Sequence, residues 1–253
     1  MSRSVGVRAS AERLVVAATM GPTVHDVHAW RLRVVPGLIE VHADRGRFRP
    51  TDDPGGRGLH LGSGAALVNL RLAAAQLGHA AVVRLLPDVE RPTLLATVRL
   101  VGRHRVTRDE RLLYAATLRP LTSPIPGDRP SAAVVNELGE AARLEGARLH
   151  VLPAGPGDGV RRALLTTRGD SAAEWLRAGQ ALQRVTLAGT VRAVSTSFAY
   201  GKRGLPHLPE LLELEPGEVP QVSVTFAGTA PVRLFKSPVG GQDEGEGHPE
   251  RIG

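Results

Sequence analysis

The sequence predicts an α+β protein built from two similar halves, each with one long helix and several antiparallel strands. The first observation is that short alternating segments give way twice to long segments with helical spacing of apolar residues. The second is that Gly, Pro and Ser stand between these segments at positions typical of turns and helix caps. The third is that the order of elements repeats in the second half of the chain.

The strands are expected where apolar residues alternate or cluster between turn residues. The first two form a hairpin, because Pro36-Gly37 between them is a tight-turn pair. Trp30, at the start of this hairpin, is expected to be a core or hairpin anchor. Strands are expected over 30–35, 38–42, 81–86, 94–101, 149–152, 162–167, 191–197 and 221–227.

The helices are expected from helical spacing and from residues that cap their ends. Ser63 is predicted to cap the first long helix, and Gly78 to end it. Ser171 and Glu174 form a capping box for the second long helix, with Gly189 as its stop. The shorter helices run from Ser10 through Leu14 to 18, from 108 to 116, and from Ser131 to 142.

The two halves correspond in order and spacing, although few residues are identical. The junction between long helix and strand over 77–83 has its counterpart over 188–194, and the strand start over 92–98 has its counterpart over 219–225. The alternative is two unrelated helix–strand units. The predicted division is a first half over 1–105, a second half over 106–236, and a disordered tail over 237–253, rich in Gly, Glu and Pro.

Composition excludes several classes of protein. With no cysteine, the chain has no disulfides, thiolate metal sites or cysteine nucleophile. The formal charge of +7 comes almost entirely from arginines scattered along the chain, since lysine occurs only at 202 and 236, and few aromatic residues are present to stack on bases. We therefore expect no nucleic-acid partner. The sequence shows no membrane span and no basic-apolar leader, so we expect a cytoplasmic protein.

Three strings resemble a known family. Gly21 to Trp30 is similar to the motif A-P-S-x-H-N-x-Q-P-W, with Pro22, His25 and Trp30 matching and Thr23 conservative. The stretch from Asp53 to Leu67 resembles D-x-x-G-R followed by the first core helix. Trp175 to Leu182 resembles the L-R-x-G-x-x-L string of the second core helix. Together they resemble the Acg branch of the FMN-binding nitroreductase-like superfamily.

The resemblance implies a nitroreductase-like fold in which two fused halves act as a pseudo-dimer around one FMN. It places Thr23, Asp26 and His28 at the flavin, and Thr117 and Arg119 at the phosphate or ribityl chain. Arg233 represents the C-terminal basic motif of the family, beside Lys236. NADPH or NADH is implied as electron donor and a small molecule as substrate. The protein is expected to be a pseudo-dimeric monomer or a homodimer.

The sequence also departs from the family at the cofactor. Asp26, His28 and Ala29 replace Asn, Gln and Pro, and Ala115 replaces the first arginine of the phosphate motif R-x-[ST]-x-R. Losing one charge-assisted contact costs about 1.5–3 kcal/mol. The stretch from 153 to 161 is short where family members carry a lid. Either the site is open to water and large substrates, or the cofactor has been lost.

Other constellations favour simpler interpretations. His25, Asp26 and His28 lack the spacing and the partners of a metal site, so no metal is expected. Ser63 lacks the context of a nucleophile elbow. The loop from Tyr200 to Gly204 is basic and flexible, and either lines the groove or forms a solvated hairpin tip.

Three functions remain open from the sequence. The first is an FMN-dependent oxidoreductase that transfers hydride to a small organic substrate. The second is a flavin-binding or flavin-sequestering protein without turnover. The third is a subunit of a biosynthetic complex that kept the fold and lost the cofactor.

Overall fold

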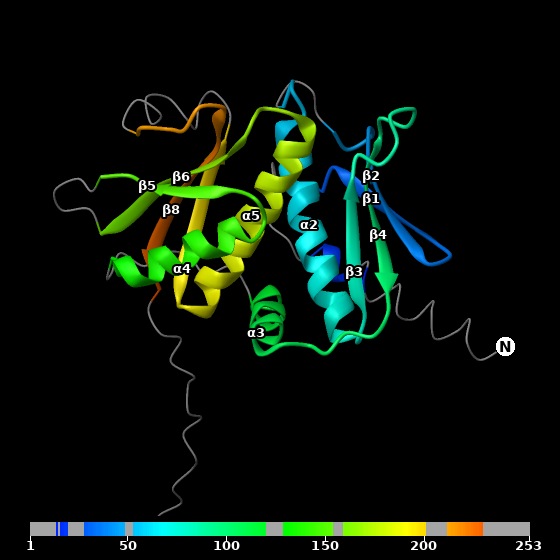
Figure 1. Cartoon of the computed structure of the whole chain (residues 1–253), viewed down its shortest axis with the longest axis horizontal. Coiled ribbons are helices and arrows are strands. Elements are labelled where there is room, and N and C mark those ends of the chain that lie inside the picture. Colours follow the sequence, from blue (N-terminus) through cyan, green and yellow to red (C-terminus); the bar gives the residue numbers. More distant parts are fainter. Residues whose placement is uncertain are drawn as a thin grey trace, which may run out of the picture.

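The computed structural model describes residues 14, 16–19, 28–48, 53–119, 129–153, 159–200 and 212–229. Its strands form two four-stranded antiparallel sheets on either side of a helical layer (Figure 1). The first sheet has the order β1-β2-β4-β3 and the second has the order β5-β6-β8-β7. The strands are β1 (Trp30–Val35), β2 (Leu38–Ala43), β3 (Ala80–Leu85), β4 (Leu94–Val101), β5 (Arg148–Val151), β6 (Val160–Arg168), β7 (Val194–Tyr200) and β8 (Glu218–Gly228).

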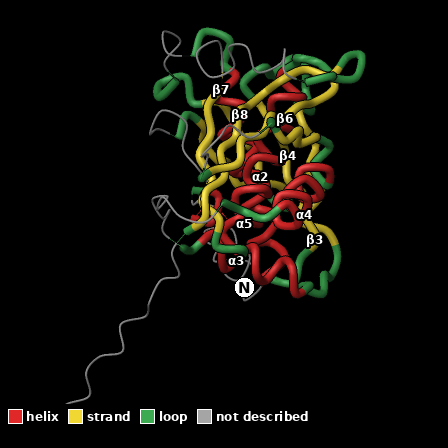
Figure 2. Tube along the Cα trace, turned by 90° about the vertical axis from the view of Figure 1, so that its left-hand side faces the viewer, coloured by secondary structure: helices red, strands yellow, loops and turns green. Residues whose placement is uncertain are grey.

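Two long helices occupy the space between the sheets, α2 (Arg57–Gln76) and α5 (Ala172–Val191), each 20 residues long. Each half therefore has the order strand, strand, long helix, strand, strand, and both sheets have the same arrangement of strands. The shorter helices α3 (Arg108–Thr117) and α4 (Ala132–Arg143) pack against this pair. In the turned view of Figure 2, strands and helices overlap, and α3, α4 and α5 lie in the lower part of the molecule. The α+β class and the antiparallel sheets are confirmed.

Each sheet buries its inner face against the helical layer. In the first half, buried residues of β2 and β4 such as Val41 and Val98 pack with Leu67 and Leu70 of α2. The hydrophobic anchor Trp30 is 6% exposed in the same core, as the sequence predicts. The second half has its own core, in which Phe226 is a fully buried side chain. Full burial of one such large side chain contributes about 1.5–3 kcal/mol, so each half carries a substantial core.

The start of α2 differs from the prediction, because the helix begins at Arg57 rather than after Ser63. Gly56 at the N-cap adopts φ 70°, and the Asp53 carboxylate accepts a hydrogen bond from Leu59 N at 3.0 Å. Ser63 lies fully buried inside the helix, where its hydroxyl donates to Leu59 O at 2.8 Å. The predicted cap at Ser63 is therefore wrong, because Asp53 caps the helix from outside its first turn.

The end of α5 also differs from the prediction. Ser171 does cap the helix, accepting from Glu174 N at 3.4 Å, but the helix passes Gly189 and ends at Val191. The left-handed residue after it is Ala193, with φ 54°, in the place that Gly78 occupies after α2 with φ 78°. Gly189 is instead a packing position, since a Cβ there would lie 3.2 Å from Val194 O. As a result β7 starts at Val194 and not at Val191.

The two long helices approach each other most closely at a pair of glycines. A Cβ built on Gly64 would lie 2.9 Å from Gln180 N and still closer to Leu176 O. A Cβ built on Gly179 would lie 2.8 Å from Leu61 Cα. Real Cβ atoms do not come this close to backbone, so only glycine permits the observed crossing.

The described part of the chain contains no helix that is both long enough and apolar enough to cross a membrane.

We predict that Gly64→Ala and Gly179→Ala each lower the free energy of unfolding by about 3 kcal/mol, because the new methyl group collides with backbone that cannot rotate away. Gly139→Ala in α4 is the matched control, since a Cβ there meets nothing within 4 Å. It should raise stability by about 0.5–1 kcal/mol through helix propensity. Urea unfolding curves compare the three, and equal effects at 64 and 139 would contradict the close crossing.

We predict that Ala193→Gly raises the free energy of unfolding by about 0.5–1 kcal/mol, because a left-handed backbone strains any residue with a Cβ. The control is Ala115→Gly, an exposed alanine inside α3, which should lower stability by about 1 kcal/mol. Thermal unfolding measured by circular dichroism should move in opposite directions for the two. A loss of stability in Ala193→Gly would disprove the strain at this position.

Candidate functional site

The predicted flavin residues are only partly within the described chain. Thr23, Asp26 and Arg233 lie outside the described residues, as do positions 201–204 of the basic loop that follows Tyr200. His28 is half-buried directly before β1, and its ring meets the Trp30 ring edge-on with centroids 5.0 Å apart. Its proposed contact with the flavin stays a prediction.

Thr117 and Arg119, which are predicted to contact the phosphate, lie at the end of α3 and differ in their exposure to solvent. Thr117 is buried, and its hydroxyl donates to Tyr114 O at 2.7 Å within the last turn of the helix. Arg119 is exposed just beyond the helix. Of these two residues, Arg119 is therefore the one whose side chain can reach a ligand from solvent.

A groove of about 510 Å³ in the second half gathers arginines from several elements, but most of their charge is neutralised nearby. Arg148 lies 2.5 Å from the Glu215 carboxylate, and Arg177 pairs with Glu174 one helical turn away. Arg168 also lines the groove. Because the carboxylates line the same groove, its net attraction for an anion is small. His28, Thr117 and Arg119 do not line it.

The N-terminal ends of α2 and α5 meet in a polar junction, formed by Arg57, His60, Asp170, Trp175 and Gln221. Arg57 donates from Nη2 to both oxygens of Asp170 at 2.7 and 2.9 Å, and from Nη1 to Gln221 Oε1 at 2.9 Å. Its guanidinium also lies 5.2 Å from the centroid of the Trp175 ring. One arginine of the first half thus contacts α5, β8 and the turn before α5 in the second.

Trp175 completes this junction, because its side chain contacts both Arg57 and Asp170, the partners of the ion pair. Its indole Nε1 donates to Asp170 Oδ1 at 2.5 Å, and its ring meets His60 edge-on with centroids 5.5 Å apart. The two strings that carried the family resemblance after residue 50 therefore touch each other here. Asp170 was not among the residues expected from the sequence, because nothing local signals a pairing across 113 residues.

The environment of His60 in this junction favours its neutral imidazole. Burial lowers the pKa of His60, while the hydrogen bond to Gly56 O at 2.6 Å and the nearby Asp53 carboxylate oppose the shift. Because a carbonyl can only accept, Nδ1 must carry the proton. His60 is thereby fixed in one tautomer and serves as a helix-end support.

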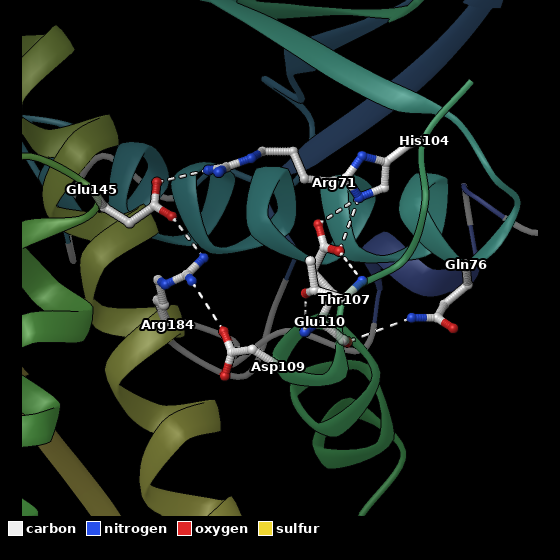
Figure 3. A network of polar contacts seen from close by, with 8 residues as sticks. All are labelled: Arg71, Gln76, His104, Thr107, Asp109, Glu110, Glu145 and Arg184. Carbon is white, nitrogen blue, oxygen red and sulfur yellow. Dashed lines mark hydrogen bonds and ion pairs between the residues drawn. The ribbon is translucent and has the colours of Figure 1, made fainter. Parts of the chain in front are cut away.

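A second polar cluster joins the halves on the other side of the crossing (Figure 3). Glu145, which is buried, accepts from Arg71 of α2 at 2.7 Å and from Arg184 of α5 at 3.5 Å. Arg184 also reaches Asp109 of α3 at 3.4 Å. Because the buried Glu145 carboxylate depends on these arginines for its charge partners, the cluster is a structural tie between four segments.

The N-terminal end of α3, beside this cluster, is also stabilised by polar contacts. Glu110 closes a capping box with Thr107 and receives His104 Nε2 at 2.9 Å. Gln76 at the end of α2 contacts Glu110 O at 3.5 Å (Figure 3). Within the described residues, no group of three or more His, Asp or Glu side chains is arranged to hold a metal ion.

Comparison with known proteins finds a local similarity to two proteins, and no family model matches the chain. Over 85 residues the sequence is 34% identical to two proteins of Mycobacterium tuberculosis, named "Putative NAD(P)H nitroreductase MT3217" in strain CDC 1551 / Oshkosh and "Putative NAD(P)H nitroreductase Rv3131" in strain ATCC 25618 / H37Rv. The aligned stretch covers 34% of this chain and about a quarter, 25%, of each relative. This similarity supports a nitroreductase-like family for the chain.

Proposed function

We propose that this protein is a flavin-dependent oxidoreductase of the Acg branch of nitroreductase-like proteins. In this proposal it binds one FMN between its halves, takes electrons from NADPH or NADH, and reduces a small organic molecule in the cytoplasm. The observation that carries the proposal is the 34% identity over 85 residues to two proteins named as NAD(P)H nitroreductases.

The arrangement of the two halves supports a pseudo-dimer. Both halves have the same order of elements and the same strand order, and their 20-residue helices meet at glycines placed alike. The polar ties at both ends of the crossing involve residues from both halves. A chain with this internal repeat can provide both sides of an interface that otherwise needs two subunits.

The residues available to hold FMN fit the cofactor only in part. Arg119 offers a charge to the phosphate, because its side chain is exposed. Thr117 already donates its hydroxyl proton to Tyr114 O, so it can only accept. When bound, FMN would exchange hydride at its N5, and the protein would supply position and hydrogen bonds.

We predict that Arg119→Met weakens FMN binding about tenfold to a hundredfold, because one charge-assisted contact to the phosphate is lost. Thr117→Val is the matched control and should leave FMN affinity within about twofold, since the hydroxyl proton is already donated within α3. Fluorescence quenching of FMN during titration measures both. Equal loss in the two variants would show that the Thr117 side chain turns toward the cofactor.

We further predict that the protein with bound FMN is yellow and is bleached by NADPH or NADH in the absence of oxygen. Bleaching separates an oxidoreductase from a flavin-holding protein, which would stay yellow. If FMN at high micromolar concentration neither binds nor raises the melting temperature, the chain is a cofactor-free scaffold and the proposed function is wrong.

A further inference from the structure

Arg129, which is partly buried, carries an unpaired edge of its guanidinium directly before α4. Its Nε and Nη2 atoms are buried, and neither has a hydrogen-bond partner within the described structure. These two nitrogens lie on one edge of the guanidinium, and this edge carries two parallel N–H groups. An arginine cannot lose its proton to escape this situation, so an uncompensated buried edge costs free energy.

The surroundings of Arg129 add positive potential. Arg161, at the start of β6, donates from Nε to Pro130 O at 3.2 Å and so lies beside the same segment. The 12-residue helix α4 begins at Ala132, three residues after Arg129, with Ser131 as N-cap and no acidic residue in its first turn. Neither Arg129 nor Arg161 forms an ion pair with an acidic residue in the described part of the chain.

From these features we infer that the segment before α4 is an oxyanion site, in which Arg129 binds a phosphate group side-on through Nε and Nη2. Arg161 supplies the second charge and the helix N-terminus supplies further polar attraction. Two cations and a helix end suit a dianionic phosphate better than a single carboxylate. The other charged clusters differ, because their arginines are already paired with carboxylates.

The phosphate could belong to FMN or to another phosphorylated molecule, and the inference does not depend on the proposed oxidoreductase function. If it is the phosphate of FMN, Arg129 would supply the charge that is missing at Ala115. If it is not, the chain has a phosphate site separate from its flavin site. The shared chemistry is a phosphate monoester or inorganic phosphate.

The test uses thermal unfolding of the full chain in chloride and in inorganic phosphate at equal ionic strength. Arg129→Met keeps the apolar stem and removes the charge, and Arg84→Met is a matched control on an exposed arginine of β3. In chloride, Arg129→Met should melt higher than wild type, because the buried, unpaired edge of the guanidinium is gone. In phosphate, wild type and Arg84→Met should rise by roughly 5 °C, and Arg129→Met should not respond.

Two results would overturn the inference. One is a phosphate response that survives in Arg129→Met, and the other is a lower melting temperature of this variant in chloride, which would mean that the arginine is held by contacts of the fold itself.

Titration with FMN and with riboflavin then separates the two possible sources of the phosphate. A tenfold or greater loss of FMN affinity in Arg129→Met, with riboflavin unaffected, identifies the flavin phosphate. Unchanged FMN affinity, or no FMN binding to any variant, identifies a separate phosphate site.

Discussion

The contact on which the rest of the structure depends is the crossing of α2 and α5 at Gly64 and Gly179. Each glycine faces backbone of the opposite helix, so the helix axes can approach only because both positions lack a Cβ. Each sheet packs its inner face on its own long helix. The distance between the helices therefore also fixes the distance between the two sheets.

Polar contacts secure this crossing at several points along its length. Arg57 and Asp170 join the helix ends, and Asn69 and Gln183 share a hydrogen bond of 2.9 Å in the buried interior. Glu145 joins the helices to α3 through Arg71 and Arg184 on the other side. Because separating these buried partners would cost free energy, the contacts favour a single register between the halves over a sliding apolar interface.

The same pairing of charges explains why most charged clusters of the protein stabilise the fold. The junction residues that match the family strings hold one half against the other, and their ionic groups already have partners. Binding capacity is instead expected where a charge lacks a partner or stays exposed. Arg119 after α3 and Arg129 before α4 meet that description, and they lie at the two ends of the connection between these helices.

The sequence by itself determined the elements whose signals are local. The hairpin around Pro36-Gly37, the strand over 94–101, the cap at Ser131 and the left-handed stop at Gly78 all follow from residues next to them in the chain. The spacing of apolar residues also located both long helices, because the helical repeat of apolar residues can be recognised within a short stretch of sequence.

Tertiary structure alone decided what depended on distant groups. Ser63 became an interior residue because Asp53 and Gly56 cap the helix earlier, and Gly189 stayed helical because its missing Cβ makes room for Val194. The pairing of Arg57 with Asp170, the buried hydroxyl of Thr117 and the orphaned edge of Arg129 were likewise invisible in sequence. A side chain's chemistry is set by which partners reach it, and those partners come from segments that only folding brings together.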